Sequence, residues 1–98
     1  MTSMESFKAS LAESAPPAGL DLALQALWWA GRNKWDRAHA LVQQREGELR
    51  CDRVHAYLHR QEGDLGNAGY WYRRAGQSFP SVSLEEEWAA TTAQLLSP

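Results

Sequence analysis

Cysteine is scarce in this sequence, since Cys51 is the only one among 98 residues. A single thiol excludes an internal disulfide and cannot build a cysteine-rich zinc site. The chain also lacks any stretch of about twenty apolar residues, and its first residues, MTSMESFKASLAES, have neither the basic start nor the apolar run of a secretion signal. These absences predict a soluble protein of a reducing compartment, with no membrane partner, and we expect it in the cytoplasm.

Lysine is rare as well, with two Lys against eight Arg, and the net charge is −2 with a pI of about 5.9. An acidic chain argues against nucleic acid as a partner, although the arginines leave room for a local basic patch. No glycine-rich loop follows a strand pattern, and no Ser, His and Asp set has the turn context of a hydrolase. The sequence therefore gives no positive support for phosphoryl or acyl transfer.

Apolar residues recur at helical spacing along the chain and nowhere alternate as in a strand. At 44% hydrophobic with five Trp, a chain of this length forms one domain, 1–98, around one core. Capping-box spacings at Thr2 and Glu5 and at Ser83 and Glu86 mark two helix starts, and Pro80 marks an end. We predict an all-α fold of about six helices, over residues 3–14, 20–31, 35–44, 49–62, 65–79 and 83–96.

The predicted helix 65–79 has an apolar side and a basic, aromatic side. Its glycines, Gly69 and Gly76, each cost about 1 kcal/mol relative to alanine, which indicates that another group lies close to them. Helical spacing assigns six of its residues to the core: Leu65, Ala68, Trp71, Tyr72, Ala75 and Phe79.

The segments 20–45 and 49–80 repeat at an offset of thirty residues. Ala26 aligns with Ala56, Ala38 with Ala68, and the turn residue Asn33 with Gly63. Internal repeats at such a period indicate stacked units of supersecondary structure. Each segment is therefore predicted to be an antiparallel helical hairpin, with the C-terminal helix 83–96 packing against them.

The second hairpin resembles the turn and second helix of a tetratricopeptide repeat. The matching residues are Gly63, Asp64, Ala68, Tyr72, Ala75 and Pro80. The resemblance implies hairpins that stack through small residues and hold a peptide in a concave groove. The sequence departs from the family pattern at Asp52, His55 and His59, and two hairpins are fewer than the three that such stacks need. The first and last helices are therefore expected to complete the core.

The two histidines of the segment HAYLH share one helical stripe. Asp52, His55, His59 and Glu62 fall on this stripe, and His39 comes from the preceding hairpin. Imidazoles four residues apart can bind a divalent metal, but HAYLH lacks the glutamate that makes the zinc-protease motif specific. We expect no bound metal or cofactor, and we interpret His55 and His59 as partly buried residues that hydrogen-bond to carboxylates such as Asp36 or Asp52.

Arginine and tyrosine side chains on the two helices of the second hairpin predict a recognition surface. It comprises Arg53, Tyr57, Arg60, Tyr70, Arg73 and Arg74, which form either one patch or two. Guanidinium groups pair with carboxylates and stack on aromatic rings, which suits an acidic segment of a partner. We therefore expect a non-catalytic protein- or peptide-binding module. A metal-dependent or acid/base activity centred on His39, His55 and His59, and a structural homodimer sealed by exposed tryptophan, remain the alternatives.

Overall fold

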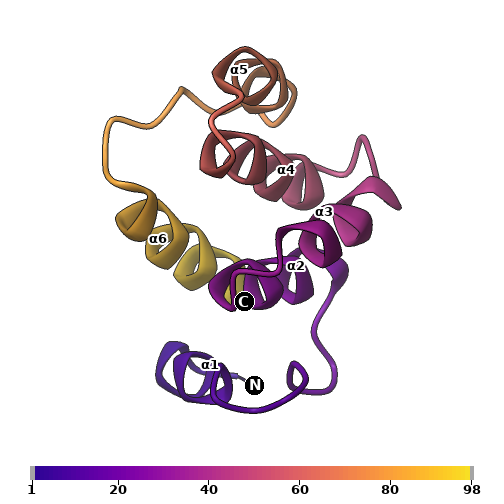
Figure 1. Ribbon diagram of the computed structural model, residues 1–98, viewed down its shortest axis with the longest axis vertical. Helices are drawn as coiled ribbons and strands as arrows, with labels where there is room; N and C mark the ends of the chain where they lie inside the picture. Colours follow the sequence, from indigo (N-terminus) through magenta and orange to yellow (C-terminus); the bar gives the residue numbers. More distant parts are fainter. Residues whose placement is uncertain (1, 98) are drawn as a thin grey trace.

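The computed structural model describes residues 2–97 and confirms an all-α fold of six helices, without a strand in this range (Figure 1). None of the described helices combines the length and the apolar character that a membrane crossing requires. The helices are α1 (Met4–Ser10), α2 (Leu22–Gly31), α3 (Trp35–Gln43), α4 (Leu49–Gln61), α5 (Leu65–Arg74) and α6 (Leu84–Leu96).

Side-chain caps begin four of the helices. Ser83 accepts a hydrogen bond from the Glu86 amide at 3.0 Å, as the sequence predicts, and Asp21 and Asp64 cap α2 and α5. The cap of α1 is Ser3, which forms a reciprocal capping box with Ser6. The predicted box of Thr2 and Glu5 is therefore wrong by one residue, because the serine pair makes the same two bonds one position later.

Helix α1 ends at Ser10, four residues before its predicted end. The next amide, that of Leu11, bonds to the Lys8 carbonyl at 3.1 Å, which is the tighter turn typical of a helix terminus. Arg32, at the end of α2, donates to the Leu11 carbonyl at 2.8 Å. A side chain distant in sequence thus satisfies a carbonyl that a longer helix would have used.

Helix α5 ends at Arg74 rather than at residue 79, because Gly76 adopts the left-handed conformation with φ of 70°. The Gln77 amide bonds to the Tyr72 carbonyl at 2.9 Å, which closes the helix as in a Schellman motif. Gly69 is inside α5, but the nearest atom to an added Cβ would be the end of the Arg73 side chain at 3.6 Å. The predicted close neighbour of these glycines is therefore not found.

The two hairpins, α2 with α3 and α4 with α5, repeat the same turn. The Lys34 amide bonds to the Trp29 carbonyl, and thirty residues later the Asp64 amide bonds to the His59 carbonyl, both at 2.9 Å. Asn33 and Gly63 both have positive φ, at 60° and 88°. The paired alanines of the two hairpins are all fully buried: Ala26, Ala38, Ala56 and Ala68.

Helix α6 lies across α2 and α4 and closes the main core (Figure 1). Trp88 of α6 donates to the Leu27 carbonyl at 2.8 Å, and its ring lies 6.0 Å from that of Phe7 in α1. Gly31 is where α2 approaches this layer most closely, since an added Cβ would meet Trp88 at 3.0 Å. The largest side chains of this core that are fully buried are Trp28, Phe7, Leu27, Leu58, Val42 and Val54.

Candidate functional site

Helix α6 covers part of the predicted recognition surface. Tyr57 is buried at 4% exposure, and burial raises the pKa of its hydroxyl to about 12. Arg60 pairs with Glu87 of α6, with 2.8 Å between Nη1 and Oε1. The prediction that these two residues belong to an exposed surface is therefore wrong, because α6 packs on the face of α4 that carries them.

Glu87 is a buried carboxylate that the sequence did not single out. It is 6% exposed and accepts hydrogen bonds from Arg60 and from the Tyr72 hydroxyl. Burial, followed by the bond to Glu87, raises the pKa of Tyr72. Its position on the same side of α6 as the buried Thr91 and Leu95, at steps of four residues, is the signal that distinguishes it from Glu85 and Glu86.

The exposed part of the predicted surface lies on α5. Tyr70, Arg73 and Arg74 form a group at this helix that we call the α5 arginine patch. Arg74 Nη1 donates to the Tyr70 hydroxyl at 3.1 Å, and its guanidinium carbon lies 4.8 Å from the centre of the Trp71 ring. Arg73 is exposed and has no ion pair within residues 2–97. The patch therefore presents one oriented guanidinium and one free guanidinium to solvent.

The sixth predicted residue, Arg53, is half-buried and lines a small cavity of about 140 Å³. Tyr72 and Glu87 line the same cavity. The predicted surface is thus divided: three residues lie in the α5 arginine patch, and the others face α6 or this cavity.

Two residues expected in the core are exposed. Leu65 is 57% exposed at the start of α5, and Phe79 is 45% exposed beyond its end. Helix α5 packs mainly against α4, and Ala68, Trp71, Tyr72 and Ala75 are buried as expected. Trp28 is fully buried, and the other four tryptophans are buried or half-buried, so the exposed tryptophan that motivated a homodimer is not found.

The three histidines of the chain converge between α3 and α4. His39 Nε2 lies 3.0 Å from His55 Nε2, and the rings of His55 and His59 stack with centres 4.9 Å apart. Trp71 also stacks on His55 at 3.9 Å, and Trp35 stacks on His39 at 4.5 Å. The sequence predicted that these histidines lie between helices, but not that aromatic rings from both hairpins enclose them.

The predicted carboxylate partners of the histidines are wrong. Asp52 instead accepts from the Gly47 amide at 3.0 Å, and Asp36 makes no bond to a histidine. His59 lies 3.4 Å from the Asn67 side chain of α5, a residue that sequence reasoning missed. The Nδ1 atoms of His55 and His59 are buried and have no hydrogen-bond partner within the described chain.

Burial disfavours the charged form of two members of the histidine cluster, which comprises His39, His55 and His59. Burial lowers the pKa of His55 to about 4, with further contributions from His39 and His59. Burial and then His59 also lower the pKa of His39. Two imidazoles whose nitrogens are 3.0 Å apart share a hydrogen bond only if at least one is uncharged, so the lowered pKa values agree with the geometry.

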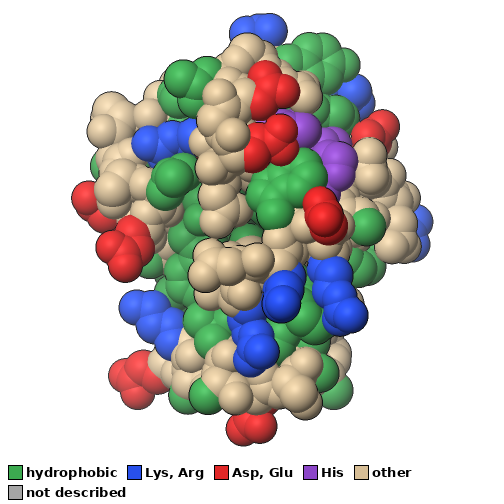
Figure 2. Space-filling view, viewed as in Figure 1, with side chains coloured by type: hydrophobic (Ala, Val, Ile, Leu, Met, Phe, Trp, Pro, Cys, Tyr) green, Lys and Arg blue, Asp and Glu red, His purple; other side chains and the backbone are tan. Residues whose placement is uncertain are grey.

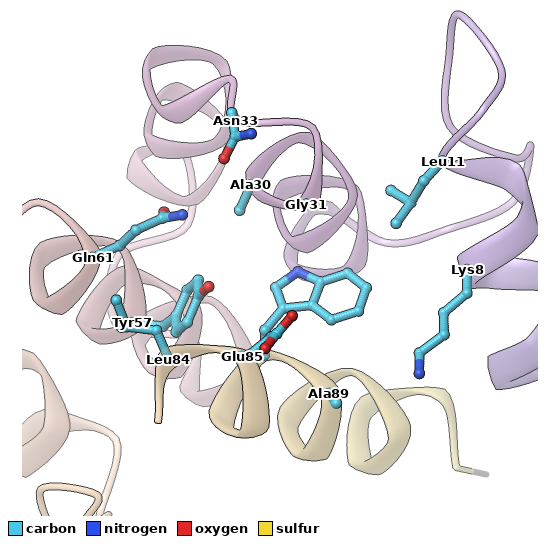
Figure 3. A pocket seen from close by; sticks show the side chains of 11 residues that line it. Lys8, Leu11, Ala30, Gly31, Asn33, Tyr57, Gln61, Leu84, Glu85 and Ala89 are labelled. Carbon is cyan, nitrogen blue, oxygen red and sulfur yellow. The ribbon is translucent and has the colours of Figure 1, made fainter. Parts of the chain in front are cut away.

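A cavity of about 590 Å³ lies between α1, α2, α4 and α6 (Figure 3). Tyr57 and Gln61 of α4 line it together with Trp88 of α6, and Lys8 and Glu85 lie along it. The Gln61 Oε1 atom is buried without a hydrogen-bond partner in residues 2–97. Tyr57 therefore faces an internal groove beside α6, away from the α5 arginine patch.

No protein-family model, curated protein or solved structure matches the chain significantly.

Proposed function

We propose that this domain is a protein- or peptide-binding module that recognises a carboxylate-bearing segment through the α5 arginine patch. The observation that carries the proposal is the position of Arg74, which is oriented by the Tyr70 hydroxyl and by the Trp71 ring. Side chains fixed before binding lose less conformational entropy when a partner arrives.

The chemistry of the patch suits an acidic partner. One Arg74 donor reaches Tyr70, and Asp52 Oδ2 lies 4.0 Å from Arg74 Nε, so donors of the guanidinium fork remain for a ligand. Arg73 adds a second exposed guanidinium one residue away. Tyrosine and arginine are the residues that most often dominate the energy of protein interfaces. A partner's acidic segment or C-terminus would pair bidentately with such groups.

The position of α6 supports recognition on α5 and not in a groove formed by α2 and α4. The faces of α2 and α4 that would line a groove in a tetratricopeptide-like stack pack against α6, through contacts such as Trp88 with Leu27 and Glu87 with Arg60. A peptide would have to displace these contacts. The proposal places the module in the cytoplasm, where Cys51, buried and unpaired, stays a thiol.

Affinity capture with quantitative mass spectrometry tests the proposal. The bait is the full chain, and it is compared with the double variant Arg73→Ala, Arg74→Ala. We expect captured partners to fall at least about tenfold, which corresponds to about 1.4 kcal/mol of binding free energy.

The matched control is the double variant Arg37→Ala, Arg45→Ala, which removes the same charge from two exposed residues of the first hairpin. It should retain the partners. Equal capture by the parent and by the α5 variant, with both folded by circular dichroism, would show that the patch is merely solvated.

A further inference from the structure

The histidine cluster has the composition and the spacing of a metal site, a property that goes beyond the proposed function and does not depend on it. One nitrogen from each of His39, His55 and His59 lies within 4.8 Å of the others. These are all the histidines of the chain, and they come from two helices of different hairpins. We propose that His39, His55 and His59 together bind one divalent transition metal ion, with Zn²⁺ as the physiological type.

The distances are close to those that a bound ion requires. Zn–N bonds are about 2.0 to 2.1 Å, so two nitrogens in a tetrahedral site lie roughly 3.3 to 3.4 Å apart. The nearest pair, His39 Nε2 and His55 Nε2, is at 3.0 Å, and small rotations of the rings would admit the ion. His55 and His59 are four residues apart on α4, which places both imidazoles on one helical face.

Unsatisfied nitrogens give the cluster capacity for a ligand. His55 and His59 are 2% and 6% exposed, and the Nδ1 atom of each is buried without a hydrogen-bond partner in the described residues. A buried polar atom left in this state costs about 1 to 3 kcal/mol. An ion satisfies such an atom only where that nitrogen is itself the ligand.

The ligand type also selects among metal ions. Metal binding requires ligand nitrogens that carry no proton, and a neutral imidazole has one such nitrogen. Three imidazoles suit zinc, copper, nickel and cobalt rather than calcium or magnesium. Cys51 does not compete, because burial raises the pKa of its thiol to about 12.

Carboxylates stand at the edge of the cluster, where a fourth ligand would be needed. Glu62 Oε2 lies 3.7 Å from His59 Nδ1, and Glu62 and Asp64 form a second close group with His59. His39 is half-buried, and histidine atoms reach the surface among acidic and apolar side chains in Figure 2. An ion can therefore enter without unfolding of the hairpins.

Titration of the metal-free full chain with Co²⁺, followed by visible absorption and by competition with Zn²⁺, tests the site. Co²⁺ reports coordination through its d–d absorption, which Zn²⁺ lacks. We expect one ion per chain, displacement of Co²⁺ by Zn²⁺, and a Kd for Zn²⁺ of about 1 µM or tighter. Zn²⁺ should also raise the melting temperature in a concentration-dependent manner.

His39→Gln is the decisive variant because His39 is the least buried of the three, so the fold should survive its replacement. We expect this change to weaken Zn²⁺ binding by at least about tenfold. Arg37→Gln, on the same helix but stacked on Trp29, is the control and should bind as the parent does. Absence of stoichiometric binding by the parent, or unchanged affinity in the folded His39→Gln variant, would show that the cluster is only a packing contact.

Discussion

At the scale of single residues, burial lowers the pKa of the His55 imidazole. His55 is 2% exposed and stacked with the rings of Trp71 and His59, and its pKa is lowered from 6.5 to about 4. A group with a folded-state pKa below its unfolded value takes up a proton on unfolding. The metal-free protein should therefore lose stability as the pH falls from 7 through the range between 6.5 and 4.

We predict that protonation of His55 alone lowers the free energy of unfolding by on the order of 2 kcal/mol between pH 7 and pH 5. Urea denaturation at both pH values, with a chelator present, measures this loss. His55→Gln should be less stable at pH 7 but should show a correspondingly smaller loss on acidification. An equal loss of unfolding free energy in the two proteins would contradict the assignment to His55, because the titration of carboxylates contributes to both.

Helical spacing predicts which residues share a helix face, but it does not predict which faces are exposed to solvent. Helical spacing grouped arginine and tyrosine side chains into one predicted surface, yet Tyr57 and Arg60 are covered by α6 while Tyr70 is exposed. Spacing tells which residues share a face, but it does not tell whether solvent or another helix lies on that face. Helical spacing likewise does not specify how closely His39 approaches His55, because that distance depends on how the two hairpins pack together.

At the scale of the elements, local signals predicted the existence of every helix, whereas two of the helix ends differ from the prediction. The apolar spacing and the caps at Asp64 and Ser83 are properties of neighbouring residues. The end of α1 is different, because Arg32 binds the Leu11 carbonyl from another helix. The end of α5 was present in the sequence as Gly76, a C-terminal glycine signal that the more distant Pro80 obscured.

The two glycines of the α5 segment should respond oppositely to substitution by alanine. Gly76→Ala places a Cβ in the left-handed region at φ of 70°, and we expect a loss of about 1 kcal/mol. Gly69→Ala is inside the helix with no backbone nearby, and we expect a gain of up to about 1 kcal/mol. Thermal or urea denaturation of both variants checks the pair, and equal destabilisation would contradict the observed end of α5.

At the scale of the whole molecule, the repeat predicted the two hairpins but not the placement of α6. The thirty-residue offset predicted equivalent turns, and the hydrogen bonds at Lys34 and Asp64 reproduce them. The apolar face of α6 indicates that the helix is buried without identifying its neighbours. By packing across α2 and α4, α6 leaves α5 at one end of the molecule with its outer face uncovered (Figure 1).

The central claim is that a partner binds this outer face of α5, and site-specific photo-crosslinking tests it most directly. The crosslinker p-benzoylphenylalanine is placed at position 66, which shares a helical face with Tyr70 and Arg73 and where an added Cβ meets no atom within 4 Å. The comparison position is 94, an exposed residue of α6. We expect a crosslinked adduct between position 66 and an acidic segment of a partner, and we expect it to disappear in the double variant Arg73→Ala, Arg74→Ala. An adduct at position 94 but not at position 66 would contradict binding at the outer face of α5.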